Sequence, residues 1–252
     1  MTIGAGYLLS HTSGIPDYFA DKQFIELVLR EPGRGWTPLE TIQRAKEHAE
    51  PGFRPGDGYR YCDTEYQLLG LIIDRVTGKS FHEALDERIF KPLGMDRSYV
   101  LHYSEPAHGH SAPLAPVYFK DTEGSSFRSM SFAWADGGIV STSEELLRFI
   151  RALNEGKLVG QETFVRMQEW RKESMGMYYG CGLMQFRFKE LLFALPDMNV
   201  IGHSGSIGSY RYYNPDYDVY ITGTFNQSGY ERKHMRFIIE VLTRAAEYAD
   251  KE

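Results

Sequence analysis

The sequence predicts an α+β fold in which helices and strands are segregated along the chain. Helical periodicity dominates the first 175 residues, segments rich in aromatic and β-branched residues follow, and one amphipathic helix closes the chain. Segregated elements favour an antiparallel sheet flanked by helices over a doubly wound parallel sheet. We therefore expect a mainly helical lobe at 1–175, which also carries the loops with polar motifs. The strands and the C-terminal helix of an α/β lobe are expected at 176–252.

Local signals place the individual elements. Thr37, Pro38 and Glu40 form a capping-box pattern at the start of one helix, and Ser80 and Glu83 repeat it at another. The sequence predicts helices over 21–30, 38–49, 64–76, 81–90, 143–153, 161–170 and 231–249. It predicts strands over 178–188, 199–202, 208–213 and 217–226.

Composition and charge exclude several classes of protein. The 252 residues carry a net charge of −6, whereas phosphate binding needs a surplus of Lys and Arg, so we expect no nucleic acid partner. No apolar run approaches the ~18 residues of a membrane span. Cys62 and Cys181 form neither a disulfide framework nor a metal motif, so no metal and no cofactor are expected, and Cys62 is expected to be a buried structural thiol. No signal peptide pattern follows Met1, and the compartment is left undefined.

Five segments follow one another in an order that is typical of one family. They are Leu8–Tyr18 with its Ser-His-Thr-Ser-Gly run, Tyr61-Cys62-Asp63 with the helix behind it, Phe90–Met95, Gly137–Thr142, and Gly202-His203-Ser204-Gly205. Each segment is weak evidence alone, but five in order are strong evidence. The chain resembles the β-lactamase-related and penicillin-binding-protein-like serine hydrolases, which include class C β-lactamases, D-alanyl-D-alanine carboxypeptidases and esterases. The resemblance implies a β-lactamase/transpeptidase-like fold, with an antiparallel sheet flanked by helices, a helical lobe, and an active site between the lobes.

The resemblance also implies roles for particular residues. Tyr61 of the family's Tyr-x-Asn/Asp motif would act as a phenolate or as a proton relay to the departing group, and Asp63 would orient the catalytic lysine and the substrate. His203 and Gly205 match the family's His/Lys-x-Gly motif, in which the glycine lets the substrate approach the backbone. Ser206 would donate one N–H of the oxyanion hole. Most members carry Asn where this chain has Asp63, so its added negative charge predicts a different pH response or substrate preference.

Each of these residues also has a simpler structural interpretation. Tyr61 could pack in the core, and a lone His203 could be a satisfied structural histidine. His11 is interpreted as a residue that braces its loop by bonding the backbone, not as a catalytic base. The pair Gly137-Gly138 is interpreted as a tight backbone approach.

The sequence departs from the family in one respect. The family's nucleophile and base form a Ser-x-x-Lys pair, in which residues three apart share one face of a helix, but no lysine of this chain follows a serine by three positions. We therefore expect the chain to lack the segment that supplies the nucleophile, together with an N-terminal helix and strands. It would then contain no nucleophile and be inactive alone.

The predicted function is acyl transfer or hydrolysis through an acyl-serine, with an ester, a β-lactam or a D-amino-acid peptide as substrate. The alternative is a non-catalytic pseudoenzyme that binds a ligand or a partner on the same fold. Loss of the N-terminal strands would leave an unpaired sheet edge and an uncovered face, so we also expect self-association through the exposed sheet.

Overall fold

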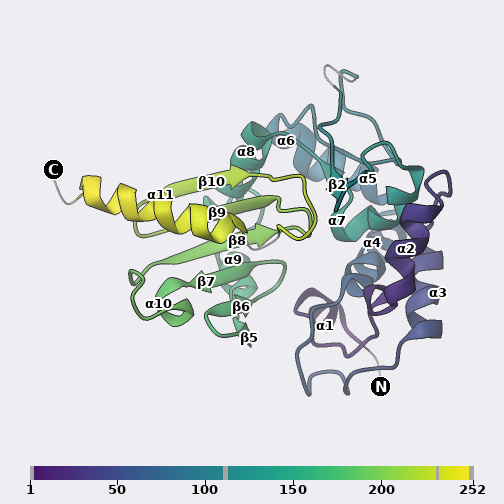
Figure 1. Ribbon diagram of the computed structural model, residues 1–252, viewed down its shortest axis with the longest axis horizontal. Helices are drawn as coiled ribbons and strands as arrows, with labels where there is room; N and C mark the ends of the chain where they lie inside the picture. Colours follow the sequence, from purple (N-terminus) through teal and green to yellow (C-terminus); the bar gives the residue numbers. More distant parts are fainter. Residues whose placement is uncertain (1–2, 110–112, 231–232, 250–252) are drawn as a thin grey trace. The chain divides into compact units, whose positions relative to one another are not determined.

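The computed structural model describes residues 3–109, 113–230 and 233–249 (Figure 1). The chain forms two compact units: unit 1 comprises residues 1–114 and 124–145, and unit 2 comprises 115–123 and 146–252. This division differs from the expected lobes at 1–175 and 176–252, because the helical residues after 145 pack on the sheet of unit 2.

Unit 1 is mainly helical and is organised around α4 (Asp63–Thr77). This helix packs against α1 (Ala5–Leu9), α3 (Pro38–His48) and α7 (Trp134–Gly137). The other elements of the unit are the 3-10 turn η1 (Tyr18–Ala20), α2 (Lys22–Arg30), α5 (Phe81–Leu85), the π-helical turn η2 (Asp86–Phe90), α6 (Lys91–Leu93), the 3-10 helix η3 (Arg128–Ala133), and the short paired strands β1 (Tyr99–Val100) and β4 (Ile139–Val140).

Both expected capping boxes are present in unit 1. The Glu40 N–H donates to Thr37 Oγ1 at 3.3 Å, and the Thr37 N–H donates to Glu40 Oε2 at 2.8 Å. At α5 the Ser80 N–H donates to Glu83 Oε2 at 2.8 Å. These bonds satisfy N–H groups that have no partner inside the helix, so the helix starts follow from the local sequence.

The glycine pair before β4 has two different environments. A Cβ at Gly138 would collide with the Ala133 carbonyl group, whereas one at Gly137 would meet open space. The predicted tight backbone approach is therefore confirmed at Gly138 alone.

Unit 2 is built on one antiparallel sheet with the strand order β10-β9-β8-β7-β6-β5. Its strands are β5 (Arg171–Ser174), β6 (Met177–Tyr179), β7 (Met184–Arg187), β8 (Asn199–Ser204), β9 (Tyr210–Asn214) and β10 (Val219–Gly223). The predicted strand 178–188 is in fact two strands, β6 and β7, joined by a tight turn in which the Gly180 N–H donates to the Leu183 carbonyl at 2.8 Å. The unit also contains the hairpin β2 (Tyr118–Phe119) and β3 (Thr122–Glu123), and α10 (Phe188–Leu191).

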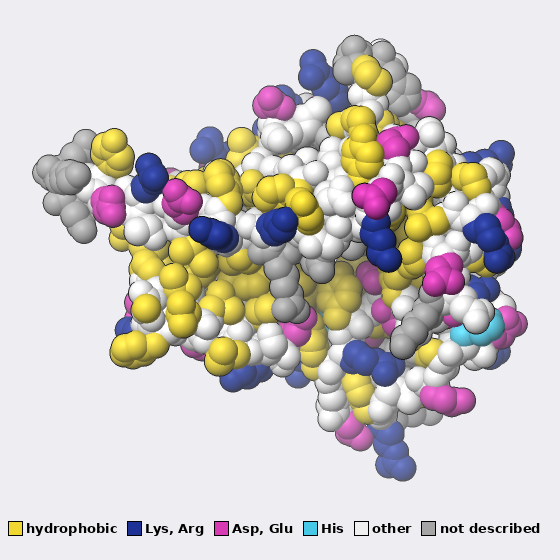
Figure 2. Space-filling model, in the orientation of Figure 1, with side chains coloured by type: hydrophobic (Ala, Val, Ile, Leu, Met, Phe, Trp, Pro, Cys, Tyr) yellow, Lys and Arg dark blue, Asp and Glu magenta, His cyan; other side chains and the backbone are white. Residues whose placement is uncertain are grey.

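Alternating side chains give the sheet two apolar faces. Val200 and Tyr212 pack with α11 (Lys233–Ala249), which lies across one face of the sheet (Figure 1). Ile201 and Tyr213 belong to the opposite face, which is covered by α8 (Ser143–Asn154) and α9 (Gln161–Met167). Figure 2 shows further hydrophobic side chains at the surface beside α11. Within the described residues, no helix combines the length and the apolar character that crossing a bilayer requires.

The two edges of the sheet have opposite character. Strand β5 reads Arg-Lys-Glu-Ser, all four side chains are exposed, and a register shift interrupts its pairing with β6. Strand β10 reads Val-Tyr-Ile-Thr-Gly, carries no charge, and pairs with β9 in unbroken register. Charged and irregular edges resist pairing with other chains, whereas flat, uncharged edges invite it. The β10 edge is therefore the one suited to receive a further strand.

The close packing of α4 on α7 predicts the effect of adding one methyl group. A Cβ at Gly70 would lie 2.6 Å from Ala135 Cβ and 2.7 Å from the Trp134 ring. Because both neighbours are rigid, Gly70→Ala should lower the free energy of unfolding by about 1–3 kcal/mol through overpacking. Urea denaturation measures this loss. The control Gly137→Ala enters open space and should leave stability unchanged or slightly raised, and equal effects of the two variants would contradict the packing argument.

The self-association expected from the sequence remains a prediction, and the sheet indicates where to test it. Thr222→Lys places a charge on the β10 edge and should reduce the fraction of oligomer, because a lysine on an edge strand disfavours strand pairing. Light scattering after size-exclusion chromatography measures that fraction. Ser174→Lys, on the already charged β5 edge, is the matched control. A monomeric wild-type chain would remove the prediction.

Candidate active site

A buried contact joins the loop of residues 10–18, here called the His11 loop, to the first turn of α4. His11 Nδ1 lies 2.5 Å from Glu65 Oε2, and both side chains are fully buried. The Ser13 hydroxyl donates to Glu65 Oε1, and the Ser13 N–H donates to the same oxygen at 3.2 Å. The Cys62 backbone nitrogen lies 3.2 Å from the same Nδ1, so the His11 ring contacts the backbone before α4 as well as Glu65, as expected of a residue that braces its loop. Glu65 thus fixes the loop against the residues that precede α4.

The same loop also caps α4. The Asp17 carboxylate accepts hydrogen bonds from the backbone N–H groups of Asp63, Thr64 and Phe19, the last at 3.2 Å. In return, the Tyr18 N–H donates to Thr64 Oγ1 at 3.0 Å. Cys62, at the N-cap position itself, provides no side-chain cap. A residue 46 positions upstream of α4 therefore supplies the acceptor that a helix N-terminus requires, and it holds the Tyr61–Asp63 segment in place.

A second carboxyl group lies behind Asp63. Tyr18 Oη donates to Asp136 Oδ2 at 2.5 Å, and Gln67 Nε2 donates to the same oxygen at 2.9 Å and to the Phe132 carbonyl at 2.8 Å. Tyr18 and Gln67 are completely buried. Asp136, from α7, is therefore held in one position by side chains of η1 and α4, and its charge acts on Asp63.

Tyr61 lies against the ring of His11. The two ring centroids are 4.2 Å apart, and the planes are tilted by 43°. Burial is the main cause that raises the pKa of Tyr61 well above the ordinary value for tyrosine, and the nearby carboxyl group of Asp63 adds to it once that group is ionised. The phenol of this chain is therefore held in its protonated form, which fits a proton relay better than a phenolate base.

Cys62 lies between these residues but does not have the properties of a nucleophile. Its side chain is buried, and its Sγ–H points to the Ile15 carbonyl at 3.5 Å. Burial, and then the charge of Asp17, raise the pKa of the thiol, whereas reactive cysteines have lowered values. The expectation of a buried thiol is confirmed.

In unit 2, His203 is oriented by its own strand end. Its Nδ1 lies 2.8 Å from the Ser204 carbonyl, so this nitrogen carries the proton and donates. Its Nε2 lies 3.4 Å from Tyr179 Oη, and the two rings meet edge to face. The strand thus holds the imidazole in one orientation, with a proton on Nδ1.

Gly205 and Ser206 form the tight turn that leads from β8 to β9. The Gly205 N–H donates to the Ser209 carbonyl at 2.8 Å, and the Gly208 N–H donates back to the Gly205 carbonyl at 3.0 Å. A Cβ at Gly205 would lie 2.5 Å from Ser209 Oγ, a hydroxyl that can rotate away, so the turn itself does not require glycine there. Ser206 is exposed at the turn.

The predicted site residues thus fall into two groups. Tyr61 and Asp63 lie together in unit 1, whereas His203, Gly205 and Ser206 lie together in unit 2. A shared cleft for the two groups remains a prediction.

Sequence reasoning missed the residues that hold the first group. Asp17, Tyr18, Glu65 and Asp136 were not predicted as part of the site. Glu65 and Gln67 do carry a signal, because they are polar residues in a stretch with a helical apolar period, and a buried carboxylate needs partners. Asp136 is signalled only by its position before the glycine pair.

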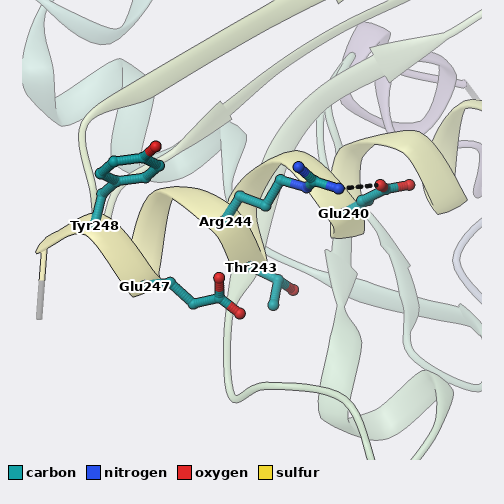
Figure 3. Close-up of a pocket in the computed structure, with 5 residues that line it drawn as sticks. All are labelled: Glu240, Thr243, Arg244, Glu247 and Tyr248. Atoms are coloured by element: carbon teal, nitrogen blue, oxygen red, sulfur yellow. Dashed lines mark hydrogen bonds and ion pairs between the residues drawn. The ribbon is translucent and has the colours of Figure 1, made fainter.

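Two surface hollows lie elsewhere, one in each unit. The one drawn in Figure 3 is lined by Glu240, Thr243, Arg244, Glu247 and Tyr248, all from α11, with an ion pair of 3.1 Å between Arg244 and Glu240. Another, in unit 1, is lined by residues between His82 and Ala107. Neither includes a predicted site residue. Over the described ranges, no group of three or more His, Cys, Asp or Glu side chains is arranged to hold a metal ion.

The antiparallel sheet with its helices, and the helical unit with Tyr61 and Asp63 at a helix start, define a β-lactamase/transpeptidase-like fold, as the sequence predicted. The chain belongs to the Beta-lactamase family, whose family model matches residues 6–243. The family suggests serine hydrolase activity.

Three relatives show how similar this chain is to individual proteins. The D-stereospecific amidohydrolase from Streptomyces sp. has a similar structure, with a TM-score of 0.77 and 29% sequence identity, over 90% of this chain and 68% of that one. Penicillin-binding protein 4 of Amycolatopsis lactamdurans is 36% identical over 40% of this chain and 24% of its own length. A D-aminopeptidase of Gluconobacter oxydans is 26% identical over 60% of this chain and 28% of its own length. The chain thus matches about a quarter of each of these two curated relatives.

The buried His11–Glu65 contact predicts a large loss of stability on truncation. Glu65→Ala would leave His11 and Ser13 without their buried carboxylate, so the free energy of unfolding should fall by about 3–5 kcal/mol. Urea denaturation followed by circular dichroism measures this. Glu31→Ala, which removes an exposed partner of Arg30 and Arg34, should cost no more than ~1 kcal/mol. Similar losses in the two variants would contradict the role given to Glu65.

Proposed function

We propose that the chain carries most of the active site of a serine hydrolase that cleaves an amide bond next to a D-amino-acid residue, through an acyl-serine. The observation that carries the proposal is the Tyr61-Cys62-Asp63 segment, which is fixed at the start of α4 by Asp17 and Glu65 and keeps its phenol protonated. The likeness to a D-stereospecific amidohydrolase over 90% of the chain supports this bond and this configuration. Esters and β-lactams are the other acyl donors that the same chemistry would accept.

The proposed mechanism follows from what each residue can do with a proton or a charge. The serine of a Ser-x-x-Lys pair would attack the carbonyl carbon and give its proton to a base. The neutral phenol of Tyr61 would pass a proton to the departing nitrogen and recover one from the base. The Ser206 N–H would donate to the developing oxyanion, which is stabilised most when donors are already in place. His203 would line the substrate's path with its ring held by Ser204 and Tyr179.

The required nucleophile is the part of this mechanism that the sequence does not contain, because no Ser-x-x-Lys occurs in it. A second candidate function is a pseudoenzyme that binds the same class of D-amino-acid ligand without cleaving it. The two functions differ in whether a covalent adduct forms.

The chain alone should form no stable acyl-enzyme. Incubation with a p-nitrophenyl ester or a fluorescent penicillin, followed by intact-mass analysis, should show no stoichiometric adduct, because an unactivated serine hydroxyl is a poor nucleophile. An adduct on any serine of this chain would show that the nucleophile has been misassigned.

Complementation separates the enzyme from the pseudoenzyme. A supplied upstream segment with Ser-x-x-Lys, in cis or as a peptide, should raise the melting temperature and allow hydrolysis of a D-amino-acid p-nitroanilide. The same segment with Ser→Ala should raise the melting temperature without activity, and Tyr61→Phe should lower kcat of the complemented enzyme by ~10²–10⁴-fold. Saturable ligand binding with no turnover would favour the pseudoenzyme.

A further inference from the structure

Three carboxyl groups lie around the start of α4. Asp63 is the first residue of the helix, Asp17 caps it from the His11 loop, and Asp136 approaches from α7. All three are half-buried, and the charges of Asp17 and Asp136 both act on Asp63. Carboxylates that share one site disfavour one another's ionisation, because each charge raises the pKa of the next.

Their hydrogen-bond donors rank the three groups. Asp17 accepts from three backbone N–H groups, those of Phe19, Asp63 and Thr64. Asp136 accepts from Tyr18 Oη and Gln67 Nε2. Across the described residues, no donor to the side chain of Asp63 is found. Hydrogen-bond donors stabilise the ionised form of a carboxyl group. As pH rises, Asp17 should therefore ionise first, Asp136 next and Asp63 last.

The groups that face Asp63 from each neighbouring element reinforce this order. The His11 loop and η1 contribute Asp17 and the phenol of Tyr18, the segment before α4 contributes Tyr61, and α7 contributes Asp136. His11 acts on Asp17, and Glu65 of α4 is turned toward His11. The helix N-terminus favours a negative charge, but only weakly at a single position, and Asp17 already occupies the capping site.

We propose that Asp63 is a neutral carboxylic acid in the folded protein at neutral pH, and that it donates a hydrogen bond into the site as an asparagine side chain would. The sequence predicted that the substitution of Asp for Asn would add a negative charge. The surrounding carboxylates reverse that expectation, because they hold a proton on Asp63 and so make it a close mimic of the amide, with one donor and one acceptor.

The pKa directions agree with the donor ranking. Burial, and then the charges of Asp136 and Asp17, raise the pKa of Asp63 well above its usual range. Burial also raises the pKa of Asp136 to about 7, although its hydrogen bonds from Tyr18 and Gln67 oppose this. For catalysis, this inference rests on the proposed function, in which the neutral Asp63 positions the substrate or the base by a donated hydrogen bond. Its test involves no catalysis.

The direct test is a carboxyl titration of the whole chain by NMR. In uniformly ¹³C-labelled wild-type protein, the Cγ of Asp63 can be assigned through bonds to its own backbone and followed from pH 4 to pH 8. We expect its shift to stay at the protonated position at pH 6, well above the pKa of ~3.9 of an unperturbed aspartate. Titration of Asp63 near the ordinary value for aspartate would overturn the proposal whether or not the protein hydrolyses anything.

Two variants test whether the charge of Asp136 keeps Asp63 protonated. Asp136→Asn removes one facing charge and should move the Asp63 midpoint to lower pH, whereas Asp57→Asn should leave it unchanged. An unmoved midpoint in Asp136→Asn would overturn the part given to Asp136. The wild-type titration stands even if a variant fails to fold.

Thermal stability provides an independent measurement of the same proton. An aspartate whose folded pKa is raised loses stability as pH rises from about 4, where the unfolded chain releases its proton, up to the folded pKa. Asp63→Asn removes this loss, so its Tm should match that of the wild type near pH 4 and exceed it by roughly 5 °C at pH 8. A Tm difference that is constant with pH would mean that Asp63 is ionised at the same pH in both states, and would overturn the proposal.

Discussion

The buried attachment of the His11 loop to α4 is the constraint on which the rest of the first unit depends. Burying a carboxylate costs free energy unless hydrogen-bond donors surround it. The Glu65 carboxylate contacts the N–H and the hydroxyl of Ser13 and the ring nitrogen of His11. Once these contacts form, Asp17 is brought over the N-terminus of α4, and Tyr18 reaches Asp136. The position of Tyr61 and Asp63 therefore depends on a loop that begins 51 residues before Tyr61.

The fold was predictable where the signal is local. The capping boxes at Thr37 and Ser80 span three residues each, so the sequence shows both partners at once. Strand β5 shows the opposite case, because Arg-Lys-Glu-Ser has no apolar alternation and is extended through its pairing with β6. The turn within 178–188 was hidden in an aromatic run, and Gly182, with a φ of 71°, is what allows it. Tertiary pairing overrides local propensity at both places.

The candidate site was predictable as motifs but not as a network. Tyr61 and Asp63 were found from their family pattern, because a motif keeps chemistry within a few positions. Glu65 contacts His11 across 54 positions, and Gln67 contacts Asp136 across 69, so no spacing rule connects them. The protonation of Asp63 could not be predicted for the same reason: the charge of a side chain is set by neighbours that only the folded chain supplies.

The burial of Cys62 has a practical consequence for observing this protein. Its thiol is enclosed between the His11 loop and α4, and its raised pKa keeps it un-ionised at neutral pH. A thiol reagent can therefore modify Cys62 only after the His11 loop has separated from α4. Before that, the reagent cannot reach the sulfur and the thiol is not ionised. The rate at which Cys62 is modified therefore measures how often the His11 loop separates from α4.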